Sequence, residues 1–327
     1  MEKIISLIHE AQNFILTGHT SPDGDSIGSC FGLAFALAHL GKDVTVVLEP
    51  YPQKYHIIPG RQFLHQGSVD KLIGGKPYVL IALDTAEMSR LGVSQCLFPH
   101  ATHTVCIDHH KTNTGFAELN HIQPDASSTS EMVYYLIEKL APLTQDIAAA
   151  IYAGIVCDTG GFKYHATSPS TFEVAEKLIA TGIPFTHIYN EVYHMHSFGA
   201  TKAKGIVLNN AKQALDGRIT YAHISRAELE QAGASTPDLD GFVEYLLTTR
   251  GSLVALLVYE TKSKAHVKAS FRSHGIDVAK VANAMGGGGH QLASATTVKG
   301  TLAAVMAQAL DLLKEEILSV DRRSEHL

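Results

Sequence analysis

Near its start the chain contains the polar stretch Gly18-His19-Thr20-Ser21-Pro22-Asp23-Gly24-Asp25-Ser26-Ile27-Gly28-Ser29. It follows the apolar run Phe14-Ile15-Leu16, which is typical of a buried strand. Apolar residues at helical spacing come after it, namely Ile27, Cys30, Phe31, Leu33, Ala34 and Leu37. The imidazole of His19 and the carboxylates of Asp23 and Asp25 therefore lie in a strand-to-helix turn. Open α/β sheets keep their functional sites at such turns.

The two carboxylates of this turn need an explanation, because like charges so close together repel each other unless a cation or a proton intervenes. A divalent metal ion is one reason to keep both Asp23 and Asp25. The alternative is an ordinary helix N-cap, since Asp and Ser favour helix starts. The turn alone leaves both interpretations open.

Two further apolar runs end in residues of the same kinds. Tyr78–Leu83 is followed by Asp84, and Thr104–Ile107 is followed by the Asp-His-His sequence 108–110. Buried parallel strands are near-continuous apolar runs, and their carboxyl ends meet at one edge of a sheet. Asp158 follows a predicted helix and precedes two glycines. We therefore expect these acids and imidazoles to share one site.

The predicted fold class is α/β, with two domains in a chain of 327 residues. A parallel-sheet catalytic domain is expected over 1–190, a helical connector over 191–214, and a smaller α/β domain over 215–327. The second boundary is placed near Arg218 because apolar and polar residues begin to alternate there, as in a half-buried strand. The active site is expected in the cleft between the domains.

Composition limits the possible partners and surroundings. The chain is 45% hydrophobic and 18% charged, an ordinary globular balance. Its formal net charge of -6 argues against a long duplex, which requires a basic face. Four cysteines without paired spacing indicate a reducing compartment. No signal-peptide layout and no membrane-spanning run are present in the sequence, so we expect a soluble, cytoplasmic protein without a membrane partner.

Taken in order, these motifs resemble those of the DHH phosphoesterase superfamily and its DHH-associated second domain. The matching motifs are His19-x-x-x-Asp23-x-Asp25, Asp84, Asp108-His109-His110, Asp158, Phe271-Arg272-Ser273 and Gly286-Gly287-Gly288-Gly289-His290. The resemblance spans roughly residues 10–300 and is greatest to the NrnA-type branch of nano-RNases and pAp phosphatases. One departure is Ser294-Ala295, which stands where the family commonly has Ala-Gly.

The resemblance implies two divalent metal ions, with Mn preferred and Mg as the second choice. The implied ligands are His19, Asp23 and Asp84 for the first ion, and Asp25, Asp84, His109 and Asp158 for the second, with Asp84 bridging. His110 is expected to face the scissile phosphate, where it would stabilise the phosphate charge or protonate the leaving oxygen. Asp108 is expected to orient the imidazoles. The implied substrate-binding residues are Arg272, Gly287, Gly288, Gly289 and His290.

The implied function is hydrolysis of short single-stranded oligoribonucleotides to mononucleotides, with pAp to AMP as a related reaction. Two alternatives stay open: a phosphodiesterase for linear or cyclic dinucleotides, and a non-catalytic nucleotide sensor. An inorganic pyrophosphatase is disfavoured, because that branch lacks the glycine loop with His290. A long-DNA exonuclease of the RecJ type is disfavoured by chain length and charge. A homodimer is compatible with the sequence, which does not fix the oligomeric state.

Overall fold

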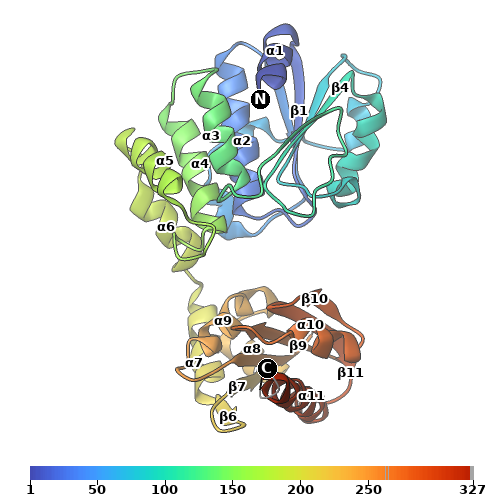
Figure 1. Ribbon diagram of the computed structural model, residues 1–327, viewed down its shortest axis with the longest axis vertical. Helices are drawn as coiled ribbons and strands as arrows, with labels where there is room; N and C mark the ends of the chain where they lie inside the picture. The colour runs from blue at the N-terminus through green and yellow to red at the C-terminus, as the bar shows by residue number, and fades with distance from the viewer. Residues whose placement is uncertain (262, 264, 325–327) are drawn as a thin grey trace. The chain divides into compact units, whose positions relative to one another are not determined.

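The chain divides into two units, Met1–Met195 and His196–Leu327, in the computed structural model, which describes residues 1–261, 263 and 265–324 (Figure 1). The end of the predicted second domain, at 327, lies outside the described residues. Each unit has its own sheet and its own buried core. The predicted α/β fold with a parallel sheet and a second α/β domain is confirmed.

The first unit contains a five-stranded, fully parallel sheet in the order β2-β1-β3-β4-β5. Its strands are β1 (Asn13–Thr17), β2 (Asp43–Val47), β3 (Val79–Leu83), β4 (His103–Asp108) and β5 (Leu119–Ile122). Every residue of β3 is buried, as its continuous apolar run predicts. Strand β5 was not predicted, because it is a half-exposed edge strand whose Leu-Asn-His-Ile sequence has no apolar run.

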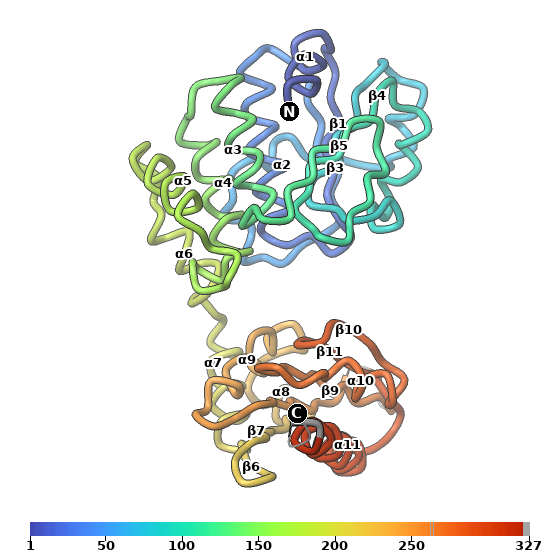
Figure 2. Tube along the Cα trace, viewed as in Figure 1, coloured from blue at the N-terminus to red at the C-terminus, as the bar shows by residue number. Residues whose placement is uncertain are grey.

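Helices α2, α3 and α4 pack side by side over one face of this sheet, as the chain trace shows (Figure 2). The helices of the unit are α1 (Glu2–Glu10), α2 (Gly24–His39), α3 (Thr129–Glu138), α4 (Gln145–Asp158), α5 (Pro169–Ala180) and α6 (Phe185–Tyr193). The short 3₁₀ helices are η1 (Gln53–Ile57), η2 (Arg61–Phe63), η3 (Val69–Leu72) and η4 (Met88–His100). Residues of η3 and η4 pack with the small cluster on the opposite face.

The close packing of α2 against α4 depends on Gly28. A Cβ atom at this position would lie 2.5 Å from the carbonyl oxygen of Ala150 and 2.9 Å from the amide nitrogen of Gly154. Because backbone atoms cannot move aside as a flexible side chain can, only glycine fits at this crossing. The contact brings the N-terminal turn of α2 close to α4, which ends at Asp158.

The second unit contains a six-stranded mixed sheet in the order β10-β11-β9-β8-β7-β6. Its strands are β6 (Lys212–Ala214), β7 (Ile219–Ile224), β8 (Val254–Glu260), β9 (His266–Ser273), β10 (Gly288–His290) and β11 (Ala293–Lys299). Strands β7 and β8 are parallel, and the other pairs are antiparallel. The glycine run predicted as a loop thus ends in a short strand that pairs with β11.

Two helix layers cover the faces of this second sheet. The helical elements are α7 (Phe198–Asn209), α8 (Arg226–Ala232), η5 (Thr236–Leu239), α9 (Phe242–Leu247), α10 (Val278–Ala284) and α11 (Leu302–Ser324). Helices α10 and α11 contribute to one core cluster, and α7, α8 and α9 contribute to the other. Helix α7 lies in the segment predicted as a connector, 191–214, and its Ala203 and Val207 are fully buried in the core of the second unit. No helix among the described residues has both the length and the apolar character needed to cross a membrane.

Candidate functional site

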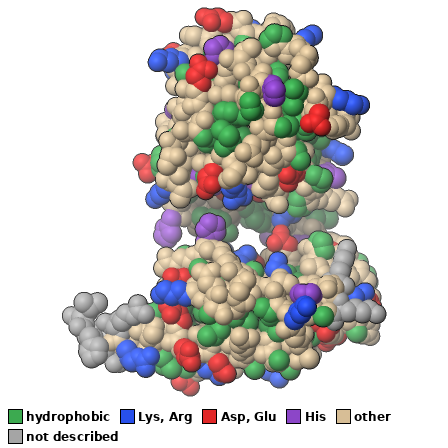
Figure 3. Space-filling view, turned by 90° about the vertical axis from the view of Figure 1, so that its right-hand side faces the viewer, with side chains coloured by type: hydrophobic (Ala, Val, Ile, Leu, Met, Phe, Trp, Pro, Cys, Tyr) green, Lys and Arg blue, Asp and Glu red, His purple; other side chains and the backbone are tan. Residues whose placement is uncertain are grey.

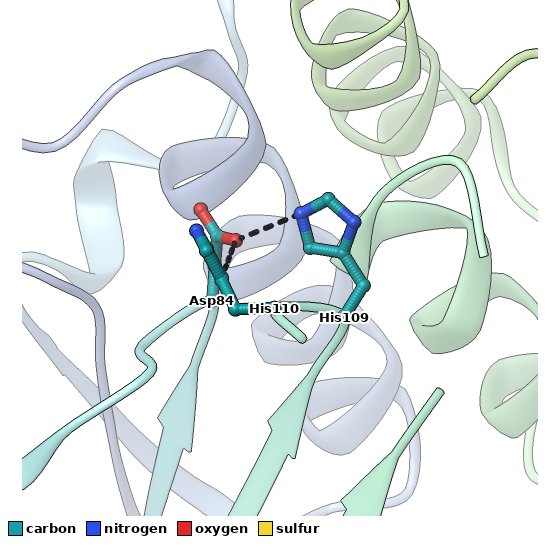
Figure 4. Close-up of side chains that lie close together, drawn as sticks. All are labelled: Asp84, His109 and His110. Atoms are coloured by element: carbon teal, nitrogen blue, oxygen red, sulfur yellow. Dashed lines mark ion pairs between the residues drawn. The ribbon is translucent and has the colours of Figure 1, made fainter. Parts of the chain in front are cut away.

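The ends of β3 and β4 bring three polar side chains together (Figure 4). Asp84 directly follows β3 and is 2% exposed, while His109 and His110 directly follow β4. Oδ1 of Asp84 lies 3.7 Å from Nε2 of His109 and 3.8 Å from Nδ1 of His110. Asp84 has a φ of 55°, in the left-handed region that Asp tolerates better than most side chains. The predicted meeting of these strand ends is observed.

The turn between β1 and α2 adds three more side chains to the same place. Nε2 of His19 lies 3.5 Å from Oδ2 of Asp84 and 3.7 Å from Oδ1 of Asp23. Oδ1 of Asp23 also accepts hydrogen bonds from the amides of Asp25 and Ser26, at 3.0 and 3.1 Å. Asp23 therefore caps α2 and also faces the cluster, so the two interpretations of this turn are compatible.

The possible ligand atoms form three overlapping groups, in each of which the atoms lie within 4.8 Å of one another. The groups are His19, Asp23 and Asp84; Asp25, His109 and Asp158; and Asp84, His109 and His110. Nε2 of His109 is 3.2 Å from Oδ2 of Asp158. All six side chains predicted as metal ligands thus belong to this cluster, and Asp84 belongs to two of the groups.

Asp25 is held by the N-terminus of α3, a contact that the sequence did not reveal. The amides of Thr129 and Ser130 donate to its two carboxylate oxygens at 2.7 and 2.8 Å. Asp25 is 1% exposed, so both bonds are shielded from water. Burial, followed by the negative charges of Asp84 and Asp158, raises the pKa of Asp25 well above its ordinary value. A cation at this point would remove that penalty.

Two other members of the cluster have shifted pKa values. Burial lowers the pKa of His19, but hydrogen bonds to Asp23 and Asp84 outweigh this and raise the pKa to about 10. Burial, assisted by Asp84, raises the pKa of Asp158 to about 7 against the opposing effect of His109. The carboxylates therefore attract positive charge to this position. Carboxylate oxygens with imidazole nitrogens, and no thiol among the three groups, suit Mn²⁺ or Mg²⁺.

His110 is fixed by a second layer of hydrogen bonds. Its Nδ1 lies 2.7 Å from Oδ1 of the fully buried Asp108, and Asn113 Nδ2 donates to Oδ2 of Asp108 at 2.7 Å. Burial raises the pKa of Asp108, but the bonds from His110 and Asn113 outweigh it and lower the pKa below its ordinary value. The bond to Asp108 raises the pKa of His110. Asn113, which was not predicted, completes this arrangement.

Four of the five predicted substrate-binding residues line a pocket of about 840 Å³ in the second unit. The lining residues include Arg272, Gly288, Gly289 and His290. Ser294 and Ala295, which stand in place of the family's usual Ala-Gly pair, also line the pocket. Gly287 has a different role, because a Cβ atom there would approach the carbonyl oxygen of Ala295 to 2.3 Å. It allows the close backbone approach of the hairpin that forms this wall.

Arg272 already has an anionic partner in this pocket. Its Nε donates to Oε1 of Glu244 at 2.6 Å, and its Nη1 donates to the carbonyl oxygen of Phe271 at 2.9 Å. Oε2 of Glu244 is buried and finds no hydrogen-bond donor in the described part of the chain. Lys268, two positions before Ser270 on β9, shares its face of the sheet with Arg272 and also lines the pocket. Sequence patterns did not point to Glu244, which comes from α9.

Comparisons with known proteins identify the class to which this two-unit fold and acidic cluster belong. Residues 13–155 match the DHH family, N-terminal domain, and residues 216–319 match the DHHA1 domain. A Thermus thermophilus protein named bifunctional oligoribonuclease and PAP phosphatase NrnA is 34% identical over 304 residues, which cover 91% of this chain and 88% of that protein. The chain therefore belongs to the DHH family and carries a DHHA1 domain.

Two further relatives extend this placement. The crystal structure of an exopolyphosphatase-related protein from Bacteroides fragilis matches with a TM-score of 0.86 at 28% identity, covering 97% of this chain and 96% of that one. Cyclic-di-AMP phosphodiesterase GdpP of Bacillus subtilis is 28% identical over 353 residues, which cover 95% of this chain but 48% of GdpP. The match therefore covers most of the Thermus thermophilus and Bacteroides fragilis proteins, but only about half of GdpP.

Proposed function

We propose that this protein is a metal-dependent phosphoesterase that hydrolyses short single-stranded oligoribonucleotides to mononucleotides, and pAp to AMP. The observation that carries the proposal is the position of Asp84, whose carboxylate lies within 3.8 Å of ring nitrogens of His19, His109 and His110. The full-length relative named oligoribonuclease and PAP phosphatase supports the substrate class.

The metal centre in this proposal contains two divalent ions, with Mn²⁺ preferred over Mg²⁺. One would be held by His19, Asp23 and Asp84, and the other by Asp25, Asp84, His109 and Asp158. When bound, such ions supply electrostatic stabilisation of the phosphate oxygens and activation of water. The donor set fits them, because buried carboxylates that repel one another surround the position.

In this proposal His110 acts at the scissile phosphate as a hydrogen-bond donor or general acid. With Nδ1 bonded to Asp108, Nε2 is the ring nitrogen available to a substrate, and the side chain is 44% exposed. The raised pKa of His110 favours the protonated ring, which can stabilise phosphate charge or donate to the leaving oxygen. Asp108, held by Asn113, keeps the ring in this orientation.

The pocket of the second unit binds the nucleotide in this proposal. Arg272 and Lys268 line it and offer positive charge for phosphate, while backbone amides of Gly288 and Gly289 can approach an anion without side-chain obstruction. Glu244 fixes the Arg272 guanidinium from one side. His290 at the end of the hairpin lines the same pocket and completes the binding set.

Surface charge favours short substrates. On the face shown in Figure 3, acidic and basic side chains are interspersed within each unit instead of gathering by sign. The formal net charge of -6 likewise provides little of the sequence-independent attraction that long nucleic acids require. We therefore expect hydrolysis to slow as the oligonucleotide lengthens.

A phosphodiesterase for linear or cyclic dinucleotides is the second candidate. It is favoured by the match to GdpP, which extends over 95% of this chain. A dinucleotide and pAp both present a nucleotide with an additional phosphate group, so the same pocket and metal centre could serve either. The non-catalytic sensor is disfavoured, because the complete set of expected ligands comes together in the structure.

A substrate panel tests the proposal. Metal-free protein is assayed with added Mn²⁺ on labelled di- to pentaribonucleotides, pAp, a cyclic dinucleotide and pyrophosphate. We expect Mn²⁺ to restore hydrolysis, with short oligoribonucleotides and pAp as the best substrates. Preference for the cyclic dinucleotide would favour the second candidate. Binding of pAp without any hydrolysis in the presence of Mn²⁺ would identify a sensor.

A further inference from the structure

A buried carboxylate outside the predicted ligand set lies behind the metal cluster. Glu131, in the first turn of α3, is 3% exposed. It accepts hydrogen bonds from the amide and hydroxyl of Ser127, from the hydroxyl of Ser170 at 2.8 Å and from the hydroxyl of Thr171 at 3.0 Å. It forms no ion pair with any cation in the described ranges. Two helix N-termini and one loop therefore converge on a single carboxylate.

Each of these segments adjoins a predicted metal ligand. Thr129 and Ser130, whose amides hold Asp25, immediately precede Glu131. The carbonyl oxygen of Ala126, 3.3 Å from Nδ1 of His109, immediately precedes Ser127. The contacts on the carboxylate thus fix both the α3 N-terminus and the loop in front of it.

The third segment, the N-terminus of α5, is connected along the chain to Asp158 at the end of α4. Helix α5, which begins at Pro169, is joined to the end of α4 by residues 159–168. Gly160, Gly161 and Phe162 in this turn all have positive φ, between 62° and 70°. The two hydroxyls that α5 donates to Glu131 anchor the far end of this turn.

We propose that Glu131 is the positioning residue of the metal site formed by Asp25, His109 and Asp158. This inference rests on the proposed function, because it takes these three side chains as metal ligands. Glu131 holds the two segments that contact Asp25 and His109, and it holds the end of the turn that follows Asp158. The other group, His19, Asp23 and Asp84, has a single contact with these segments among the described residues, the 3.2 Å hydrogen bond from the Thr129 hydroxyl to Oδ1 of Asp84, the residue that both metal ions share in the proposed function. Loss of Glu131 should therefore affect one metal site more than the other.

The size of the effect follows from the chemistry of such supports. Groups that orient metal ligands typically change metal affinity by about 10- to 100-fold when they are removed. Glu131→Gln keeps the shape of the side chain but replaces one acceptor oxygen with an amide that cannot accept hydrogen bonds. Either Ser127 and Thr171, which donate to Oε2, or Ser170, which donates to Oε1, then loses its acceptor.

The test is a Mn²⁺ titration of metal-free protein by calorimetry, with no substrate present. We expect the wild type to show two binding events, and Glu131→Gln to weaken one of them by about 10-fold or more while the other changes less than about twofold. Asp158→Asn removes a ligand of the Asp25–His109–Asp158 group alone and identifies which event belongs to that site. Equal weakening of both events, or no change in either, would overturn the inference.

Glu138→Gln is the matched control. Glu138 lies on the same helix and also connects α3 to α5, through a 2.9 Å bond from Nζ of Lys177, but its side chain is 48% exposed and far along the helix from Asp25. Both Mn²⁺ events should stay unchanged in this variant. If Glu138→Gln loses the same event, general docking of α5 explains the effect, and the special role of Glu131 is refuted.

A substitute variant and a separate activity measurement complete the experiment. If circular dichroism shows that Glu131→Gln is unfolded, Ser170→Ala takes its place. Of the bonds to Glu131 it removes only the 2.8 Å bond to Oε1, together with a bond to Oγ of Ser168, and it should weaken the same event by a smaller factor. Hydrolysis of pAp by the wild type is measured separately. A hydrolytic wild type with two Mn²⁺ events, together with a Glu131→Gln variant that titrates identically, refutes this inference and leaves the proposed function intact. A wild type with fewer than two events refutes both this inference and the two-metal centre.

Discussion

The guanidinium of Arg272 is paired with the carboxylate of Glu244, with Nε and Oε1 2.6 Å apart. The other carboxylate oxygen is buried and accepts no hydrogen bond within the described residues. The arginine that we propose for phosphate binding is therefore fixed by an acid that would itself repel phosphate. Charge balance in the pocket thus depends on both members of the pair.

This balance leads to a prediction for a pair of variants. Arg272→Ala removes a charged hydrogen bond, which is typically worth about 1.5–3 kcal/mol, or one to two orders of magnitude in affinity. It also leaves the charge of Glu244 without its partner in the pocket. We expect the double variant Arg272→Ala, Glu244→Gln to bind pAp more tightly than Arg272→Ala alone, as measured by calorimetry. A double variant that binds no better than the single one would show that Glu244 does not face the ligand.

Substrate size should separate binding from chemistry. Arg272→Ala and His290→Ala remove pocket residues of the second unit, whereas the metal ligands belong to the first. Hydrolysis of pAp should fall by roughly one to two orders of magnitude in kcat/KM. Bis-nitrophenyl phosphate, which gains little from the pocket, should lose much less. Equal losses on both substrates would contradict a binding role and would indicate that these residues support the fold or the chemistry.

The metal cluster was predictable because its residues stand at the ends of recognisable elements. Asp84 and the Asp-His-His sequence follow apolar strands, and parallel strands deliver their carboxyl ends to one edge. The residues that support the cluster were not predictable in this way. The amide of Thr129 is 104 positions from Asp25, and no local pattern relates two such positions.

The second unit shows the same limit. Arg272 and His290 stood in motifs, but Glu244 lies on the short helix α9 with no motif around it. Strand β10 was missed because the glycine run has low strand propensity and owes its conformation to pairing with Ala293–Ala295 of β11. The location of the active site in a cleft between the domains stays a prediction.

Asp84 offers the strongest test of the catalytic centre. We expect Asp84→Asn to reduce Mn²⁺-dependent hydrolysis of pAp by at least about two orders of magnitude, because it removes a charged ligand common to two of the groups. Asn is preferable to Ala, since it tolerates the φ of 55° at this position. Circular dichroism and thermal unfolding should show a folded protein. Near-normal turnover at saturating Mn²⁺ would mean that the site is misassigned.

Metal binding should depend on pH with a defined sign. In the metal-free protein the pKa of His19 is raised to about 10 and that of Asp158 to about 7, so His19 is protonated and Asp158 about half protonated at pH 7. Both groups must lose protons to act as metal ligands. Apparent affinity for Mn²⁺ should therefore increase from pH 6 to pH 8, by about tenfold per pH unit for each proton displaced.

Calorimetry in buffers of different ionisation enthalpy can count these protons directly. Net release at pH 7 should be observed for the wild type, and His19→Gln should reduce it, because the glutamine side chain carries no titrating proton. His103→Gln is a suitable control, since His103 is the exposed first residue of β4, at the opposite end of the strand from the cluster, where it pairs with Glu118. Its loss should leave proton release unchanged. Affinity that falls between pH 6 and pH 8, or metal binding without proton release, would contradict the assignment of His19 as a ligand.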